Sequence, residues 1–388
     1  MLLTPFNGGL AVARHLVRAG VDVTVLAGGS DSFTAHTRGA RGRVLHDLPG
    51  GREEWRAALG ELDGVALMTG GDVGSAFLVE ERDSLPPSTH TFESQDDVHA
   101  ALMGKRQAYD IAVEAGVRIP WTSAVSTLAE LDRVVEEARY PCVLKPDFSH
   151  LWRAVFGDDR VLLANNRDEL AKLGRAALEG GLDLLVSEYV PGDDTAMEEA
   201  IVVRARDGSY PVEFGCHKLR QYPSGFGAAS LCEVTPAEES LDLARRLLDH
   251  AGFVGVAGIE TKRHAETGEY YFIEANVRIP TQFGLGNAAG GDSAWRMYAS
   301  LAGIDVGPHP PLEYGVRLLF PELEMRGAWR SVRGKDESAG PIERLRSYRK
   351  VHDWGIADLR DPGPALSLAA GLVRRRTRKR AQRVLHRG

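Results

Sequence analysis

The hydrophobic pattern at the start of the chain alternates short apolar runs with a helical segment. Residues 1–4 and 21–28 are apolar and β-rich, and residues 10–20 between them carry apolar positions at helical spacing. A further apolar run, residues 64–70, ends in the loop Gly70-Gly71-Asp72. This order predicts a parallel sheet, and loops at the carboxyl ends of such strands are candidates for substrate contact.

The middle of the chain follows a polar, proline-containing linker at residues 84–97. Residues 97–116 and 127–138 have helical spacing, and residues 141–146 form an apolar strand that carries Lys145. A lysine on an apolar strand is costly to bury unless an anion meets it. The alternative is a lysine that extends its charge to solvent from the end of the strand.

The next apolar strand, residues 182–190, breaks at Pro191-Gly192 and ends in Asp193 and Asp194. Residues 200–219 then alternate around a turn at residues 207–208, which predicts antiparallel strands. Lys218 and Arg220 precede a glycine-containing loop. They suit a phosphate or a carboxylate, or they belong to a solvated edge strand.

Two strands joined by a tight turn are predicted at residues 255–260 and 269–277. Residues 266–268 suit a three-residue hairpin loop in which Gly268 takes the left-handed conformation. This register places Glu260 opposite Glu274, to within one residue.

Two facing carboxylates repel each other unless a cation lies between them. Period-two alternation places Asn276 on the same face as Glu274, and Arg278 follows on that face. Carboxylate and amide oxygens are ligands that Mg²⁺ accepts, with phosphate oxygens completing its shell. The pattern therefore predicts a metal–nucleotide site; the alternative is a surface hairpin with solvated acids.

The last residues have a different character from the rest. Residues 365–387 are rich in arginine, with a narrow apolar stripe formed by Leu366, Ala370, Val373, Ala381 and Val384. Such a helix is able to lie on an anionic membrane surface. A docked or exposed terminal helix is the alternative.

Composition narrows the class of protein. The 388 residues are 43% hydrophobic and 26% charged, and a net charge of −7 argues against a general nucleic-acid binder. Three scattered cysteines, no run of membrane-spanning length and no signal peptide after Met1 favour the cytoplasm. The glycine pair Gly8-Gly9 lacks the GxGxxG pattern, which excludes a dinucleotide dehydrogenase and indicates a structural turn.

In order and spacing, one set of residues resembles the ATP-grasp superfamily from about residue 99 to 290: Lys105, Lys145, the segment 187–190, and Glu260…Glu274-x-Asn276-x-Arg278. The N-terminal region resembles the domain that precedes the ATP-grasp fold in those enzymes. Residues 144–152, residues 218–227 and the strand with Arg317 are most similar to bacterial carboxylate–amine ligases related to D-aspartate ligase. The resemblance implies an α/β parallel-sheet domain at residues 1–98 and a two-subdomain α+β ATP-grasp fold at 99–185 and 186–320. A C-terminal extension follows at 321–388.

The resemblance also implies roles for single residues. Lys105, Lys145 and Lys218 hold ATP phosphates, and the backbone of Glu188, Tyr189 and Val190 receives the adenine. Asp193 or Asp194 binds the ribose. Two Mg²⁺ ions, with Mn²⁺ as an alternative, bind Glu260, Glu274 and Asn276, while Arg278 and Lys145 act at the reacting centre. Many family members have a glycine-rich flap, whereas residues 147–159 contain a single glycine, Gly157. Either Ser149 and His150 serve a bulkier flap, or the phosphate contacts differ.

The implied function is an ATP-dependent ligase that joins a carboxylate to an amine through an acyl phosphate and releases ADP and phosphate. Small molecules are the expected partners, with no nucleic acid and at most a weak membrane contact through the basic tail. Two alternatives stay open: an ATP-dependent carboxylase or carbamoyl-phosphate-type enzyme, and a nucleotide-binding module without catalysis. The oligomeric state does not follow from the sequence.

Overall fold

The structure is a computed structural model of the whole chain. It describes residues 1–388 apart from 49, 62, 93–96, 147–151, 153–154, 157–160, 334–338 and 386–388, and at residues 30 and 375–385 it describes the backbone only. The chain forms two compact units. Unit 1 comprises Met1–Gln95, Arg278–Pro321 and Lys350–Gly388, and unit 2 comprises Asp96–Val277 and Glu322–Arg349. Residues 278–321 thus cluster with the N-terminal segment and residues 322–349 with the middle one. The subdomain limits expected within residues 99–320 stay a prediction.

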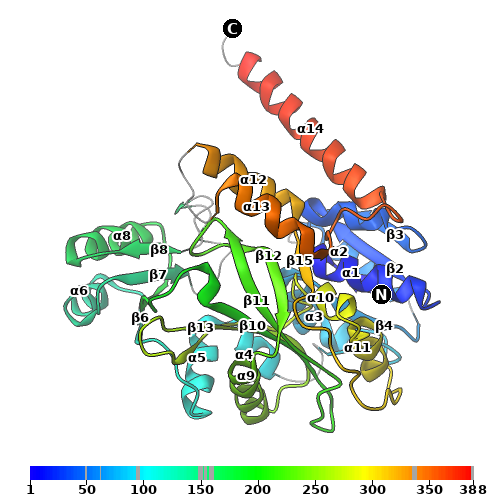
Figure 1. Cartoon of the computed structure of the whole chain (residues 1–388), viewed down its shortest axis with the longest axis horizontal. Coiled ribbons are helices and arrows are strands. Elements are labelled where there is room, and N and C mark those ends of the chain that lie inside the picture. Colours follow the sequence, from blue (N-terminus) through cyan, green and yellow to red (C-terminus); the bar gives the residue numbers. More distant parts are fainter. Residues whose placement is uncertain are drawn as a thin grey trace. The chain divides into compact units, whose positions relative to one another are not determined.

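Unit 1 contains the parallel sheet that the sequence predicts (Figure 1). Its order is β3-β2-β1-β4-β5, with bounds β1 Leu2–Leu3, β2 Thr24–Gly28, β3 Arg41–Leu45, β4 Ala66–Thr69 and β5 His90–Thr91. The connecting helical segments are α1 Phe6–Arg18, η1 Gly29–His36, α2 Arg52–Gly60, α3 Asp72–Glu81 and η2 Arg82–Ser84. Buried apolar side chains from the strands, α2 and α3 form the core, among them Leu26, Trp55, Leu67 and Phe77.

The glycine pair after β1 lies inside α1 and does not form a turn. A Cβ at Gly8 would meet the carbonyl oxygen of Pro280 at 2.0 Å, so glycine permits the close approach of the later segment to this helix. That segment continues through α10 Gly284–Ala288, α11 Ser293–Leu301 and β15 Arg317–Leu319, which pairs in parallel with β16 Val351–Asp353.

The terminal helix α14, Gly363–Leu385, belongs to unit 1. Its first turns pack through Ala365 and Leu368 against Leu10, Phe33 and Ile356, in agreement with the docked-helix alternative. Leu366 and Val373 of the expected apolar stripe are exposed. The side chains of Ala381 and Val384 lie outside the described part, and the membrane contact of the tail stays a prediction.

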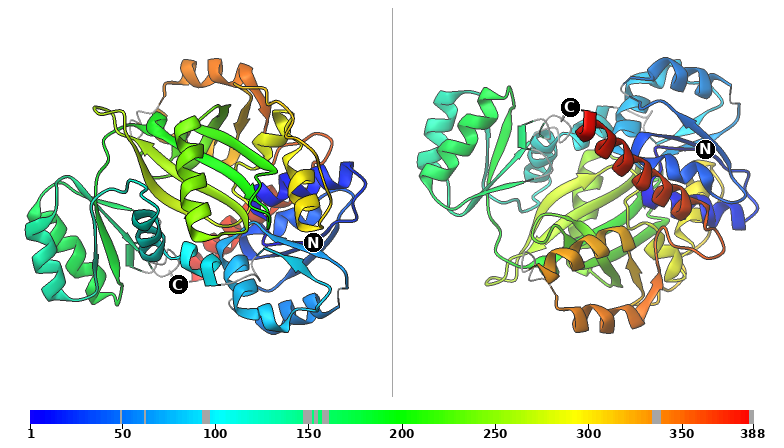
Figure 2. Two further views of the ribbon diagram at one scale, coloured as in Figure 1. Left: turned by 90° about the horizontal axis from the view of Figure 1, so that it is seen from below. Right: turned by 90° about the horizontal axis from the view of Figure 1, so that it is seen from above.

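Unit 2 contains an antiparallel four-stranded sheet of order β6-β9-β7-β8, with α6 and α8 along one face (Figures 1 and 2). The bounds are β6 Thr122–Val125, α6 Leu128–Glu137, β7 Cys142–Pro146, β8 Leu162–Ala164, α8 Arg167–Glu179 and β9 Leu184–Glu188. Thr127 and Glu130 form a capping box that starts α6 where the sequence predicts it. A Cβ at Gly174 would lie 2.5 Å from Leu131, which shows how closely α8 packs on α6.

The other strands of unit 2 belong to a seven-stranded sheet, in which they have the order β14-β13-β10-β11-β12 and are antiparallel to their neighbours within this set. Helix α9 lies across one face (Figure 2), and α4 and α5 join the same core. The bounds are α4 Asp97–Met103, α5 Lys105–Glu114, η3 Asp194–Ala196, β10 Met197–Arg204, β11 Val212–Tyr222, β12 Ala228–Thr235, α9 Glu238–Ala251, β13 Gly255–Arg263 and β14 Tyr270–Asn276. The single helix predicted for residues 97–116 is divided at Gly104, whose backbone is extended.

Unit 2 ends with α12 Pro321–Val332, whose first residue belongs to unit 1, and α13 Pro341–Ser347, followed by η4 Tyr348–Lys350. No helix among the described residues is long and apolar enough to span a bilayer. The fold class is mixed α/β, as predicted: a parallel sheet in unit 1 and antiparallel sheets in unit 2.

Candidate functional site

The antiparallel strands β14-β13-β10-β11-β12 of unit 2 carry the acids predicted to bind metal, on the face opposite α9. Ala200 on β10 and Ile259 on β13 belong to the core beneath α9, so alternation places Glu199 and Glu260 on the other face. Glu274 lies opposite Glu260 in the register, and the predicted pairing is confirmed. Asn276, two residues beyond Glu274, is opposite Gly258 on the same face.

A β-bulge brings the two acids into register. Arg263, Lys262 and Thr261 pair in turn with Tyr270, Tyr271 and Phe272, but Glu260 then pairs with Glu274. Ile273 is the extra residue of the bulge. If the register continued without a bulge, Glu274 would lie opposite Ile259 and point to the core. Gly268 has the predicted left-handed conformation, with a φ of +73°. His264 donates its N–H to Glu269 O, so the loop has one residue more than predicted.

Each of the facing carboxylates is bound by a lysine. Lys218 Nζ lies 3.0 Å from Glu260 Oε2, and Lys105 Nζ lies 2.6 Å from Glu274 Oε1. Lys105 is the first residue of α5, a position set by the break at Gly104. The two ammonium groups supply the positive charge that two facing acids need.

Lys218 is only 2% exposed and lies among acids. Burial by itself lowers the pKa of Lys218, but the carboxylates of Glu260 and Glu199 outweigh this and hold the pKa above its usual value. Glu199 is opposite Glu260 on β10 and is buried. Sequence reasoning missed Glu199, although its alternation with the apolar residues of β10 was a signal.

A second pair of lysines joins the two sheets of unit 2. Lys145, on β7, donates a hydrogen bond to the hydroxyl of Tyr109 at 3.2 Å, and that hydroxyl donates to Ile273 O at 3.0 Å. Lys262 Nζ lies 4.4 Å from the centre of the Tyr189 ring. Burial lowers the pKa of Lys262 to about 8, Asp194 and Asp193 oppose this, and the charge of Lys145 adds to it. Lys262 was not predicted, although it follows Glu260 by two residues and therefore shares its face.

The segment predicted to receive adenine begins at Glu188, the last residue of β9. The N–H groups of Glu188 and Tyr189 donate to the carbonyl oxygens of Trp121 and Pro141. The Glu188 side chain accepts from Trp121 N–H at 2.9 Å and from Arg139 at 3.1 Å. Burial, with Asp193 and Asp194, raises the pKa of the Tyr189 hydroxyl.

The two aspartates proposed for the ribose have different surroundings. Asp193 accepts hydrogen bonds from the N–H and hydroxyl of Thr195 and caps η3. Asp194 is 7% exposed and accepts bonds from Gln221, Ser224 and the Gly225 N–H. The carboxylate of Asp194 thereby holds the loop after β11.

Arg278 belongs to unit 1, whereas Glu260, Glu274 and Asn276 belong to unit 2. Arg278 Nε donates to Asp72 Oδ1 at 2.6 Å, and the next residue, Ile279, donates its N–H to Thr69 O. The loop after β4, a predicted candidate for substrate contact, therefore orients Arg278.

The predicted flap, with Ser149, His150 and Gly157, lies outside the described residues. Trp152 and Phe156, which are described, belong to the core of the four-stranded sheet, with ring centres 4.5 Å apart.

The oxygen ligands on this face fit a divalent cation only together with further ligands. Among the described residues there is no group of three or more His, Cys, Asp or Glu side chains that could hold a metal ion. Two opposed carboxylates and an amide are present, and both carboxylates already attract a cationic side chain. Such a partial oxygen set fits Mg²⁺ with phosphate oxygens as further ligands.

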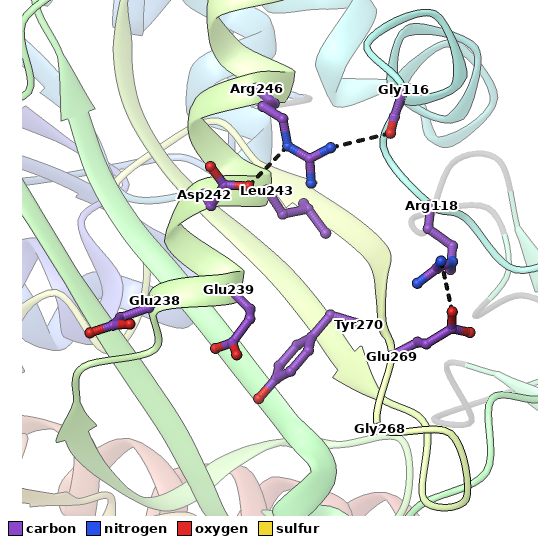
Figure 3. Close-up of a pocket in the computed structure, with 10 residues that line it drawn as sticks. All are labelled: Gly116, Arg118, Glu238, Glu239, Asp242, Leu243, Arg246, Gly268, Glu269 and Tyr270. Atoms are coloured by element: carbon purple, nitrogen blue, oxygen red, sulfur yellow. Dashed lines mark hydrogen bonds and ion pairs between the residues drawn. The ribbon is translucent and has the colours of Figure 1, made fainter.

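A separate groove of about 540 Å³ lies beside α9 and the β13–β14 hairpin (Figure 3). Four of its charged side chains form two pairs: Arg118 with Glu269 at 2.8 Å and Arg246 with Asp242 at 3.0 Å. Because α9 lines it, the groove is on the opposite side of the sheet from Glu260 and Lys218.

No family model matches the chain. It is 29% identical over 191 residues to the N-terminal section of the carbamoyl phosphate synthase large chain of Methanopyrus kandleri, covering 47% of this chain and 32% of that protein. Against the carbamoyl phosphate synthase large chain of Methanothermobacter thermautotrophicus it is 27% identical over 194 residues, which is 47% of this chain and 18% of that one. The chain thus spans a third or less of the length of these curated relatives.

Solved structures resemble most of the chain. An ADP complex of N5-carboxyaminoimidazole ribonucleotide synthetase matches with a TM-score of 0.64 and 15% identity, covering 86% of this chain and 84% of that one. A biotin carboxylase from Campylobacter jejuni matches with a TM-score of 0.62 and 16% identity, covering 81% and 73%. The chain therefore has the fold of these two enzymes.

Proposed function

We propose that the chain is an ATP-dependent ligase that phosphorylates a carboxylate and joins it to an amine, releasing ADP and phosphate. The observation that carries the proposal is the opposed pair Glu260–Glu274, in which each acid is bound to a lysine. Acids and lysines gathered at one sheet face suit a polyphosphate with its metal ions. We also propose that the chain belongs with the bacterial carboxylate–amine ligases related to D-aspartate ligase, which its sequence resembles.

The nucleotide would bind in unit 2. Lys105, Lys145 and Lys218 are the proposed phosphate ligands, and the pairing of Lys262 with Tyr189 adds a fourth cation near Lys145. With two N–H groups of the adenine segment already used, the Glu188 carbonyl and the Val190 N–H are the proposed adenine contacts. Because Asp194 holds a loop, Asp193 is the better candidate for the ribose.

Glu260, Glu274 and Asn276 would hold two Mg²⁺ ions, with Mn²⁺ as an alternative. Bound there, the ions supply positive charge to the phosphate oxygens. Lys105 and Lys218 would then be able to turn their ammonium groups from the acids to the phosphates.

Carboxylate activation needs positioning and charge, and no side-chain nucleophile. A carboxylate oxygen attacks the γ-phosphorus of ATP, and ADP leaves. The amine nitrogen then attacks the acyl carbon and loses a proton to solvent, and the C–O bond to the phosphate oxygen breaks as phosphate leaves. Arg278, oriented by Asp72, is proposed to bind the carboxylate in a bidentate pair and to stabilise the oxyanion, and Lys145 to neutralise the transferred phosphoryl group.

A second candidate function is the activation of bicarbonate as carboxyphosphate. The sequence similarity to carbamoyl phosphate synthase large chains favours it. A nucleotide-binding module without catalysis is less well supported, because all of the proposed ligands are present.

Small-molecule acids and amines are the proposed partners. A cytoplasmic setting is supported by Cys142, Cys216 and Cys232, which are free thiols.

The test is a screen of the purified chain for ADP release with ATP, Mg²⁺ and pairs of amino acids and small carboxylic acids. The proposal expects release that needs both an acid and an amine. It also expects one ¹⁸O atom in the released phosphate when the acid carries ¹⁸O. Release with bicarbonate alone would favour the second candidate instead.

A further inference from the structure

Helices α12 and α13 expose large apolar side chains to solvent. On α12, Met325, Trp329 and Val332 are 70%, 59% and 72% exposed. On α13, Ile342 and Leu345 are 68% and 69% exposed. These five residues are called the α12–α13 surface. Isolated exposed apolar residues are normal, but a group of this kind marks an interaction site.

The two helices run antiparallel and are fixed to each other. Glu324, near the start of α12, accepts from Arg344 at 2.7 Å and from Tyr348 at 3.0 Å, near the end of α13. Ser331, near the end of α12, donates to Ala339 O at 3.1 Å. The α12 and α13 ribbons lie side by side in Figure 1.

This contact turns the apolar side chains of both helices to one side. A helix advances by roughly 100° per residue, so Met325 and Leu345 are each turned by that angle from the Glu324–Arg344 contact. In an antiparallel pair the two rotations lead to the same side. Trp329 and Val332 follow Met325 at i+4 and i+7, and Ile342 precedes Leu345 by three, so each set shares one helix face.

The surface is anchored to the sheet of unit 2. Arg220 on β11 lies 2.9 Å from Glu324, and Ser230 on β12 donates to the same carboxylate at 2.9 Å. Arg220 and Arg344 hold the pKa of the Glu324 carboxyl below its usual value, although burial opposes them. The exposed apolar face is therefore carried by a buried ionic cluster and is not a frayed end.

Arginines accompany the apolar residues. Exposed arginines lie on the same two helices or directly after them: Arg326, Arg330, Arg333, Arg346 and Arg349. The described acids of this segment are Glu322, Glu343 and the buried Glu324. Arg333 stacks over the Trp329 ring at 4.2 Å. Because the whole chain has a net charge of −7, this positive charge is local.

We propose that the α12–α13 surface binds an anionic lipid bilayer. Trp329 and the aliphatic side chains enter the headgroup region, and the arginines contact lipid phosphates. A second copy of the chain is a poorer occupant, because a twofold interface would bring the two arginine sets against each other. This inference does not depend on the proposed ligase activity.

A lipid surface is also favoured over an acidic protein. The exposed side chains are a tryptophan and unbranched or branched aliphatics beside arginines, which is the composition of helices that lie in the membrane interface. Helix α14, in unit 1, independently exposes Leu366, Leu372 and Val373 in an arginine-rich segment.

The test is co-sedimentation of the full chain with vesicles of phosphatidylcholine alone and of phosphatidylcholine with phosphatidylglycerol. The surface variant is Trp329→Gln with Leu345→Gln. Its matched control is Val113→Gln with Tyr314→Gln. These two residues lie outside the α12–α13 surface, and each is 57% exposed. A charge variant, Arg326→Gln with Arg330→Gln, is compared with Arg175→Gln, and a chain ending at Val373 removes most of the tail.

The expected result is binding to the anionic vesicles only, reduced about tenfold or more by the surface variant and by the charge variant, with both controls unchanged. Equal thermal unfolding of all variants shows that folding is not the cause. Absence of binding to anionic vesicles overturns the proposal, and so does equal binding by the surface variant. Loss of binding on tail truncation alone would assign the membrane contact to α14 instead. If the chain does not bind vesicles but self-associates, and the surface variant abolishes this self-association, a second copy is the occupant and the proposal is overturned. Capture of an acidic protein without vesicle binding likewise contradicts the proposal.

Discussion

Glu260 and Glu274 lie directly opposite each other on β13 and β14, and each carboxylate is neutralised by its own lysine. The two pairs differ in burial. The side chains of Lys218 and Glu260 are 2% and 18% exposed, whereas those of Lys105 and Glu274 are 15% and 35% exposed. The arrangement makes a preformed acidic site stable without a bound metal ion.

This difference predicts unequal costs for two similar substitutions. Glu260→Gln leaves the charge of buried Lys218 poorly compensated and should lower the free energy of unfolding by about 3 kcal/mol. Glu274→Gln breaks a more solvated pair and should cost less than about 1 kcal/mol. Urea unfolding of both variants measures this. Equal costs for the two substitutions would contradict this prediction. A stabilised Glu260→Gln variant, which simple repulsion between the two acids would give, would also contradict it.

A second prediction concerns the stability cost of Lys262. Its folded pKa of about 8 is below the usual 10.5, so the folded chain binds fewer protons than the unfolded chain between these values. The free energy of unfolding should therefore rise with pH across this window through Lys262. Lys262→Met should remove that rise and stabilise the protein at neutral pH by about 1–3 kcal/mol. Urea unfolding at neutral pH and at about pH 9.5 tests the sign, and a destabilised Lys262→Met variant would refute the assignment.

The same substitution should weaken nucleotide binding. Loss of one cation near the phosphates is expected to raise the KM for ATP about tenfold with little change in kcat. For the wild type, the KM for ATP should rise as pH increases through about 8, because Lys262 loses its proton. A pH-independent KM in Lys262→Met is the matching control, and the same pH profile in both proteins would exclude this role.

Local patterns in the sequence were enough to predict the strands, the parallel sheet and the Glu260–Glu274 pairing. The hairpin pairing was predictable because alternation and the turn glycine, Gly268, are local. The bulge at Ile273, which completes the register, left no separate signal. The alternation of side chains between the two faces of a strand could have identified Lys262 and Glu199.

Contacts distant in the sequence were not predictable. Arg278 and Asp72 are 206 residues apart, and only the fold of unit 1 brings them together. The lysine partners of the two acids come from β11 and from the start of α5, which begins at Lys105 because Gly104 is extended. Asp194 has the sequence setting of a ligand residue, yet it holds a loop.

The contact between Arg278 and Asp72 predicts a large loss of turnover when Arg278 is replaced and a smaller loss when Asp72 is replaced. Arg278→Lys keeps the charge but loses the planar fork, so turnover should fall by roughly two to three orders of magnitude while ATP affinity is retained. Asp72→Asn should lower turnover only about three- to tenfold, because it loosens the guanidinium without removing it. Calorimetry of ATP binding beside steady-state ADP release measures both. A collapse of ATP binding in Arg278→Lys would make the residue a phosphate ligand.

The terminal helix offers a test of docking against a free tail. A chain ending at Val373 keeps Ala365 and Leu368 and should unfold at the wild-type temperature. A chain ending at Pro364 loses both and should unfold roughly 3–6 °C lower. Thermal unfolding compares the two chains. An unchanged midpoint in the shorter chain would show that the first turns of α14 contribute nothing to stability.

The most direct test of the central claim is Mg²⁺-dependent ADP release by Glu274→Gln beside Glu269→Gln. Glu269 is an exposed acid of the same hairpin and pairs with Arg118 at 2.8 Å, away from the candidate site. With an acid and an amine present, Glu269→Gln should match the wild type. Glu274→Gln should lose about a thousandfold or more of the activity and keep the wild-type fold by circular dichroism. Wild-type Mg²⁺-dependent release by Glu274→Gln would contradict the account.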